Sequence, residues 1–368
     1  MRGSPLRILV VGAGIAGLAV ARALRLAGFR PDVTDKAPPG ELGDAGLYLP
    51  GNAARALRQL DLDGPVRPFG QVIHRQRFLD AAGSPLCEVD LDALWAGVGE
   101  CRALPRSDLH RVLLSGAGGA VRHGAEVRTI DLLPAGVGVT FVDGTQTEYD
   151  LVIGADGPRS SVRALAALGG PPRPVGQVVY RSVVRDGPVV DEWTALLGQR
   201  CGLLVVPIGG GRLHCYADEA GTEVPADPRA RLRELFGEYG GPVPEVLDAL
   251  DGVHASITDE VELGRWYRGR VLLVGDAAHA TAPTLSQGAA MALEDAVVLA
   301  ESLRAANSVE AALTAYESRR RPRTRWVRDR TRDRNRTRDV PPALRDPLLR
   351  GRGDRIFGEH YRLLLGPL

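Results

Sequence analysis

A glycine pattern near the start of the chain constrains the fold more than any other feature of the sequence. Gly12-x-Gly14-x-x-Gly17 follows the apolar, β-branched run 6–11 and precedes a helical pattern over residues 15–27 that ends at Gly28. Residues 30–35 then predict a second strand. A strand, a glycine-rich turn, a helix and a further strand in this order predict the first βαβ unit of a parallel sheet.

The spacing of these glycines suits a nucleotide phosphate. Gly12 permits a tight turn, Gly14 lets a pyrophosphate approach the backbone, and Gly17 lets the helix pack closely on the strand. The phosphates then face a helix N-terminus, where free N–H groups point outward. Asp35 ends the second strand, where a carboxylate can accept hydrogen bonds from an adenosine ribose. We therefore expect a dinucleotide, and this pattern alone does not distinguish NAD from FAD.

Two more apolar runs resemble the first strand, at residues 151–153 and 270–274. We expect these runs and the first strand to form one parallel sheet built from distant parts of the chain. Alternating segments between them predict an inserted antiparallel sheet. These are residues 72–79, 85–89, 121–130, 136–142, 145–149, 178–184, 202–207 and 212–217, with a hairpin turn at Asp143-Gly144. Helices are predicted at 53–59, 107–115 and 287–305.

Charge and cysteine usage narrow the class of partner. The chain has 46 basic and 45 acidic side chains, so no overall field favours nucleic acid or an anionic membrane. No apolar run reaches the ~18 residues of a membrane span. Cys87, Cys101, Cys201 and Cys215 lack metal-binding spacing. We expect a cytoplasmic protein with reduced thiols and no metal.

One segment departs from this balance. Residues 319–338 contain eleven arginines and only two acidic residues, Asp329 and Asp333. Glu317 and Arg321 have the i,i+4 spacing of a helical ion pair, and the two aspartates lie within three or four residues of several arginines. The segment has no recognised nucleic-acid module. We therefore expect a solvated helix or a partner surface, without nucleic acid.

Two further motifs give the sequence a family resemblance. Gly154-Ala155-Asp156-Gly157 follows one apolar run, and Gly275-Asp276-Ala277-Ala278-His279 with Pro283 follows another. With the first glycine pattern, they resemble the three marks of the FAD-dependent monooxygenases of the aromatic-hydroxylase (p-hydroxybenzoate hydroxylase-like) fold. The resemblance runs from Leu6 to about Arg320. It implies an α/β fold: a Rossmann-like FAD-binding domain of the glutathione-reductase type, an interleaved antiparallel substrate sheet, and C-terminal helices.

The resemblance also implies roles and boundaries. Residues 1–70, 100–175 and 265–305 would form the FAD-binding domain, residues 71–99 and 176–264 the substrate domain, and residues 306–368 a helical region. Pro283 would lie beside the flavin ring, and Gly46 and Leu47 in the loop that skirts it. The implied cofactor-binding residues are Gly12, Gly14, Gly17, Asp35, Lys36, Gly46, Leu47, Arg106, Asp156, Gly157, Gly275, Asp276, Pro283, Gly288 and Ala289.

The segment before the last long helix departs from the family pattern. The family usually has Gly-Gln-Gly-x-Asn, whereas this chain has Ser286 and Ala290 at the first and last of these positions. Ala290 carries no amide, so the ring contacts that the resemblance implies would come from backbone N–H groups through Gly288 and Ala289. N–H groups at a helix N-terminus stabilise the negative charge of reduced flavin.

Substrate contacts are expected from the inserted sheet. Strand alternation puts Arg181 on the opposite face from Tyr180, and it puts His214 and Tyr216 on one shared face. Tyr180, His214 and Tyr216 are the candidate substrate residues. No catalytic residue is assigned, because the flavin itself takes hydride, reacts with oxygen and forms a C4a-hydroperoxide. We expect His279 to be a structural hydrogen-bonding residue.

The leading hypothesis is an FAD-dependent monooxygenase of secondary metabolism. It would use NADPH or NADH and O2 to hydroxylate an electron-rich aromatic or polyketide-like molecule. An epoxidase, a dehydrogenase or a non-redox cyclase on the same fold is the alternative, and the altered segment 286–290 motivates it. A flavin-binding regulator that signals through the arginine-rich end is a third hypothesis. The signature Trp-x-Trp-x-Ile-Pro of flavin halogenases is absent.

Overall fold

The fold is built on a sheet from distant parts of the chain that is parallel except for one antiparallel edge strand. The computed structural model describes residues 6–40 and 45–368. The strand order is β18-β19-β12-β1-β2-β8, and β1 pairs in parallel with both β12 and β2. The strands are β1 (Ile8–Val11), β2 (Asp32–Asp35), β8 (Val121–His123), β12 (Leu151–Gly154), β18 (Tyr267–Arg268) and β19 (Val271–Leu273). The predicted union of three distant apolar runs is confirmed.

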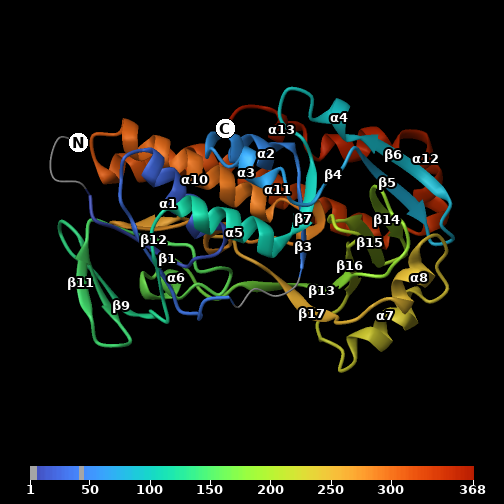
Figure 1. The fold of residues 1–368 in the computed structure, drawn as a ribbon, viewed down its shortest axis with the longest axis horizontal. Coiled ribbons are helices and arrows are strands. Elements are labelled where there is room, and N and C mark those ends of the chain that lie inside the picture. Colours follow the sequence, from blue (N-terminus) through green and yellow to red (C-terminus); the bar gives the residue numbers. More distant parts are fainter. Residues whose placement is uncertain (1–5, 41–44) are drawn as a thin grey trace.

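Helices α1, α5 and α10 lie along this sheet, and α12 packs near β6 at the opposite end of the molecule (Figure 1). Helix α1 packs along α10, which also contacts α11 and α2. The helices of the first half are α1 (Ile15–Leu26), α2 (Gly51–Gln59), α3 (Asp63–Val66), α4 (Leu91–Leu94), α5 (Arg106–Ala117) and α6 (Ser161–Leu165). Those of the second half are α7 (Pro228–Phe236), α8 (Val243–Asp248), α9 (Asp276–His279), η1 (Pro283–Leu285), α10 (Gly288–Ala305), α11 (Val309–Arg336), η2 (Thr337–Asp339), α12 (Pro342–Glu359) and α13 (Arg362–Leu365).

A largely antiparallel sheet lies toward the other end of the molecule (Figure 1). Its order is β17-β13-β16-β15-β14-β5-β6, and in the described residues of this sheet only β14 and β5 pair in parallel. The strands are β5 (Arg75–Asp80), β6 (Pro85–Asp90), β13 (Arg173–Val184), β14 (Trp193–Leu197), β15 (Cys201–Pro207), β16 (Leu213–Ala220) and β17 (His254–Glu260). One face packs on α7 and α8 in a separate apolar core.

Two small sheets complete the fold. One has the order β11-β10-β9, from β9 (Val127–Leu132), β10 (Val137–Phe141) and β11 (Gln146–Tyr149). The other has the order β3-β7-β4, from β3 (Gly46–Leu49), β4 (Gln71–Val72) and β7 (Arg102–Pro105). Gly144 closes the predicted hairpin between β10 and β11 with a φ of +87°.

The prediction of one strand over residues 121–130 is wrong. Gly124 interrupts it with a φ of +69°, a conformation that side chains rarely adopt. Val121–His123 therefore pairs with β2 in the parallel sheet, whereas Val127–Leu132 turns away to pair with β10. One alternating segment thus serves two sheets.

The expectation of a solvated arginine-rich helix is also wrong in part. The segment is helical, and the predicted Glu317–Arg321 pair is present. However, Arg320 and Arg323 are only 1% and 6% exposed, because they form ion pairs with buried carboxylates of α10. Part of the positive charge is therefore internal. No helix in the described part of the chain is long and apolar enough to cross a membrane.

Candidate functional site

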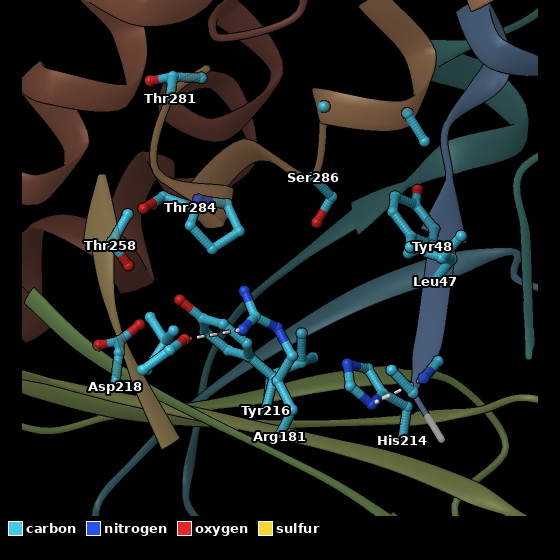
Figure 2. Close-up of a pocket in the computed structure, with 18 of the residues that line it drawn as sticks. Leu47, Tyr48, Arg181, His214, Tyr216, Asp218, Thr258, Thr281, Thr284 and Ser286 are labelled. Atoms are coloured by element: carbon cyan, nitrogen blue, oxygen red, sulfur yellow. Dashed lines mark hydrogen bonds between the residues drawn. The ribbon is translucent and has the colours of Figure 1, made fainter. Parts of the chain in front are cut away.

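A cavity of about 790 Å³ joins the edge of the parallel sheet to the antiparallel sheet. Its size lies within the range of small-molecule sites. Figure 2 shows Arg181, His214, Tyr216 and Asp218 on the antiparallel sheet, with Thr284 and Ser286 of the η1 region opposite. The predicted site residues that line the cavity are Gly14, Gly46, Leu47, Arg106, Gly157, Asp276, Pro283, Gly288, Ala289, His214 and Tyr216.

Three glycines leave room for a ligand at one end of the cavity. A Cβ added to Gly14, Gly157 or Gly288 would meet no atom within 4 Å. Gly12 and Gly17 are different, because a Cβ on Gly17 would lie 1.8 Å from the carbonyl oxygen of Gly12. The first group therefore shapes an open cradle, and the second permits the packing of α1 on the sheet.

Several predicted cofactor residues lie behind this cradle rather than along the cavity. Asp35 accepts hydrogen bonds from the Ala13 and Ala37 N–H groups, at 2.6 and 2.8 Å, so it fixes the glycine loop. Asp156 accepts from Ser161 Oγ and Val162 N–H at the start of α6, and its other carboxylate oxygen has no partner in the described chain. Lys36 is exposed.

Arg106 and Asp276 both line the cavity. Arg106 begins α5 and its N–H donates to the Ala45 carbonyl at 2.8 Å. Desolvation raises the pKa of Asp276, while His279 and Arg106 oppose the shift. Gly275 has a φ of +58°, and its N–H donates to Asp295 at 2.8 Å. This bond anchors the turn that presents Asp276.

The predicted face alternation in the antiparallel sheet is present, and it corrects one substrate assignment. Arg181, His214 and Tyr216 line the cavity. Tyr180 lies on the other face in the second core, where its hydroxyl donates to Glu219 at 2.5 Å. Tyr180 therefore belongs to the core rather than to the substrate cavity, and Arg181 takes its place.

Arg181 and Tyr216 form a polar pair on the cavity floor (Figure 2). The Arg181 guanidinium lies 5.9 Å from the centre of the Tyr216 ring and donates to Ser256 Oγ at 3.4 Å. Burial lowers the pKa of Arg181 and raises that of Tyr216 well above its ordinary value. The Tyr216 hydroxyl is buried without a hydrogen-bond partner in the described chain. Both groups can therefore bind a ligand.

His214 fixes the loop beside the cavity. Its Nδ1 lies 3.2 Å from the Gly46 N–H group and 3.3 Å from the Ser182 carbonyl. A Cβ on Gly46 would lie 2.3 Å from that of His214, so only glycine permits this approach. Burial, with repulsion from Arg181, lowers the pKa of His214 to about 4, so the ring is neutral near pH 7.

We expect this burial to make stability depend on pH. The unfolded ring binds a proton near its ordinary pKa of about 6.5, and the folded ring does so only near 4. The contribution of the neutral His214 ring to the free energy of unfolding is therefore complete above pH 6.5 and decreases as the pH falls toward 4. Between pH 7.5 and 4.5, denaturant titrations should show a loss of roughly 2 to 3 kcal/mol in the native protein that His214→Asn lacks. Equal losses in the two proteins would contradict this assignment.

His279 is a structural residue, as expected. Its Nε2 lies 2.7 Å from Asp295, and its ring packs against Trp266. Asp295 also accepts from Arg320 at 2.7 Å. Although burial alone would raise the pKa of Asp295, His279 and Arg320 lower it to about 2. The carboxylate therefore remains charged in the core.

A second buried contact supports the start of α10. Asn52 Nδ2 donates to Gln287 Oε1 at 3.0 Å and to Glu294 at 2.9 Å. Ser286 adopts a φ of +53°, in the left-handed region that glycine prefers. Ser286, which replaces the first glycine of the family pattern, therefore keeps the backbone conformation of a glycine. Gly288 and Ala289 still line the cavity.

Comparison with known proteins assigns the family. Residues 6–331 match a family model described as "FAD binding domain". A 3-amino-4-hydroxybenzoate 2-monooxygenase of Streptomyces platensis is 36% identical over 369 residues, which cover 93% of this chain and 91% of that protein. This chain belongs to the FAD-dependent aromatic monooxygenases.

Two more relatives agree with this membership. An FAD-dependent urate hydroxylase of Klebsiella pneumoniae is 32% identical over 339 residues, with 87% of each chain covered. The crystal structure of a Klebsiella pneumoniae HpxO variant complexed with FAD superposes with a TM-score of 0.90 and 28% identity, covering 98% of this chain and 99% of that one. The monooxygenase thus has the predicted fold, with a parallel FAD sheet, an antiparallel substrate sheet and C-terminal helices.

The monooxygenase has a cavity that fits FAD. The space above Gly14, Gly157 and Gly288 is the kind of backbone cradle that a dinucleotide requires, and it is continuous with the polar floor. The enzyme is a hydroxylase of aromatic compounds, in keeping with its family.

Several cavity residues escaped the sequence analysis. Asp218, Trp193, Thr258, Arg334 and Arg338 all line the cavity. Asp218 lies two residues after Tyr216 on the same strand face, so alternation contains a signal for it. Arg334 and Arg338 lie four residues apart where α11 passes into η2, and no local pattern pairs them with the antiparallel sheet.

Proposed function

We propose that the enzyme hydroxylates an electron-rich aromatic or polyketide-like molecule, with NADPH or NADH as reductant and O2 as oxidant. One oxygen atom would enter the substrate, and the other would leave as water with the two electrons of the nicotinamide. The observation that carries this proposal is the single cavity that joins the glycine cradle to a floor of unpaired polar groups.

The residues around the cradle would hold FAD. Gly14 and the N-terminus of α1 would receive the pyrophosphate, with Arg106 nearby, and Asp35 with Lys36 would serve the ribose side. Asp156, Gly275 and Asp276 would shape the turns that flank the dinucleotide. Gly46, Leu47, Pro283, Gly288 and Ala289 would lie around the ring. When bound, FAD supplies the electron transfer and oxygen chemistry that protein side chains lack.

The chain's own contribution is binding, orientation and exclusion of water. Arg181, His214 and Tyr216 present a guanidinium, a neutral imidazole and a phenol to the same space. Apolar residues of β13, β14 and β15 line the same space and would help to exclude water from it. Residues 1–70, 100–175 and 265–305 would act as the cofactor domain, residues 71–99 and 176–264 as the substrate domain, and residues 306–368 as a helical cover.

The names of two relatives support an electron-rich ring. Urate and 3-amino-4-hydroxybenzoate are the compounds in those names, and both carry electron-donating oxygen or nitrogen on an unsaturated ring. A substrate of this kind can hydrogen-bond to the polar floor while its ring packs on the apolar walls.

The test is a measurement of electron and oxygen balance. Purified enzyme with FAD should oxidise NADPH or NADH faster in the presence of a substrate from a panel of phenols and amino-phenols. One O2 should be consumed for each hydroxylated product, and isotopic oxygen from O2 should appear in that product. The Gly14→Val protein, which we expect to lack FAD, is the matched negative control.

Three outcomes would overturn this function. Product formation that continues without O2 or reductant would indicate a non-redox reaction, such as a cyclisation. Product formation that needs no O2 but reduces the flavin would indicate a dehydrogenase. Incorporation of oxygen across a double bond would indicate epoxidation by the same cavity.

A further inference from the structure

The substrate side of the cavity carries more positive than negative charge. Arg181, Arg334 and Arg338 line it, and Asp218 is the carboxylate beside them. Arg338 forms a two-point ion pair with Asp218, with one N–O distance of 2.7 Å. Arg338 therefore neutralises the negative charge of Asp218. Two guanidinium groups therefore face the cavity without a carboxylate partner in the described chain.

Arg334 is the more unusual of the two. Its guanidinium lies 4.2 Å from the centre of the Phe357 ring and 5.2 Å from that of Phe78. The Arg334 guanidinium has no hydrogen bond or ion pair to the described residues 6–40 and 45–368, whereas the Arg181 guanidinium donates to Ser256. Desolvation lowers the pKa of Arg334 to about 10, and Arg338 adds to the effect. Aromatic faces offset only part of the cost of a desolvated cation.

The position of Arg334 connects it to the reacting region of the cavity. The next residue, Asn335, accepts a hydrogen bond from Thr284 Oγ1 at 2.7 Å. Thr284 belongs to η1, which also contains Pro283. Helix α11 therefore holds the Arg334 backbone against the loop that we place beside the flavin ring.

A second unpaired donor lies close by. Trp193 is 7% exposed, lines the cavity and packs its ring 5.2 Å from Phe78. Its Nε1–H group is buried and has no hydrogen-bond acceptor in the described chain. Buried polar groups in proteins nearly always have partners. Phe78 thus contacts both Arg334 and Trp193, whose side-chain N–H groups have no acceptor in the described chain.

We propose that Arg334 binds a carboxylate of the substrate, so that the enzyme acts on aromatic acids. This inference rests on the proposed function of the same cavity. A guanidinium presents two parallel N–H groups that match the two oxygens of a carboxylate. The aromatic rings around Arg334 provide apolar surface for the substrate ring and few further donors, which suits a planar monoanion better than a phosphate.

The test compares acids with their uncharged amides. Oxidised enzyme with bound FAD is titrated with 4-hydroxybenzoate and 4-hydroxybenzamide, and with indole-3-carboxylate and its amide, while the flavin absorbance is followed. In at least one pair the acid should bind about 10- to 100-fold more tightly, as expected for a charge-assisted contact. In Arg334→Met this ratio should fall to about one.

Arg330→Met is the matched control. Arg330 lies on the same helix, stacks 5.1 Å from the Trp326 ring and pairs with Asp333 at 2.7 Å, but it does not line the cavity. Its loss should leave the acid-to-amide ratio unchanged. Arg334→Lys, which keeps the charge and removes the fork, should give an intermediate ratio and serves if Arg334→Met fails to fold.

Three results would overturn the inference. They are equal binding of acid and amide in both pairs by the unsubstituted enzyme, an unchanged ratio in Arg334→Met, and loss of the ratio in Arg181→Met alone. These titrations need no reductant or turnover. They therefore still test carboxylate binding by Arg334 if the enzyme proves not to hydroxylate its substrate. Conversely, oxygen-dependent turnover without any preference for acids would refute only this inference and leave the proposed function standing.

Discussion

The Gly14→Val substitution will give a folded protein that has lost FAD. No protein atom lies within 4 Å of the position that a Cβ would take at Gly14, and the residue has a φ of −74° that valine tolerates. The added side chain therefore enters the cavity rather than the core. Overpacking at a contact costs about 1–3 kcal/mol or more, so FAD affinity should fall on the order of 100-fold. Flavin absorbance of the purified protein and titration with FAD measure this loss.

Two other glycines make the result specific. Gly12→Val should fail to fold, because its Cβ would lie 2.4 Å from the Ala155 carbonyl oxygen and its φ is +107°. Gly264→Val should keep both fold and flavin, because Gly264 is exposed and a Cβ added there would meet no atom within 4 Å. Circular dichroism separates the first outcome from the second. Full FAD binding by Gly14→Val would show that the dinucleotide does not pass over this residue.

The Arg320→Met substitution will destabilise the protein by about 3–5 kcal/mol, the cost of leaving a buried charge unpaired. Arg320 is 1% exposed and bonds to Glu294 and Asp295, both at 2.7 Å and both fully buried. Methionine fills a similar volume but leaves Asp295 without its arginine partner. Equilibrium unfolding in denaturant gives the change in free energy.

The neighbouring arginine provides the control. Arg319 pairs with Glu301 at the same N–O distance of 2.7 Å, but the two side chains are 39% and 45% exposed. Arg319→Met should therefore cost less than about 1 kcal/mol. Equal effects of the two substitutions would mean that burial does not govern the strength of these pairs.

Low pH should weaken the buried ion pairs that Asp295 forms with Arg320 and His279. The pKa of Asp295 is about 2 in the folded state, below its unfolded value, because His279 and Arg320 overcome the effect of burial. Its contribution to stability is therefore present above the unfolded pKa and is lost as the pH falls toward 2. In Arg320→Met this pKa rises, so acid unfolding begins at a higher pH.

The parts of the fold that could be predicted are those specified locally. The glycine turn, α1 and the three apolar strands carry their signals within a few residues, and they occur where expected. Strands β14 and β17 were missed, because each is fixed by pairing with a strand far earlier in the chain, β14 with β5 and β17 with β13. The division of residues 121–130 between two sheets depends on the φ of Gly124 and on which strands are available to pair.

The site shows the same limit. Alternation in β13 and β16 correctly placed Arg181 on the opposite face from Tyr180, and His214 with Tyr216 on one face, because strand geometry fixes which side chains share a face. The arginine-rich segment looked like a solvent-exposed surface, because its partners Glu294, Asp295 and Asp218 lie 26, 25 and 120 residues away from the arginines that bind them. Long-range pairing of charge leaves no periodic trace in a sequence.

The construction of the parallel sheet has a consequence for synthesis of the protein. Strand β1 lies between β2 and β12, and β12 pairs with β19 near residue 272. The N-terminal glycine turn leaves the ribosome early, yet the strands and loops that complete the cradle emerge only when three quarters of the chain has been made. Chains grow at about 5–20 residues per second. The early strands of the sheet therefore remain without β19 for on the order of tens of seconds. Capture of FAD is therefore among the last events of folding, and a nascent chain that stalls before β19 exposes β12 as an unpaired edge prone to aggregation.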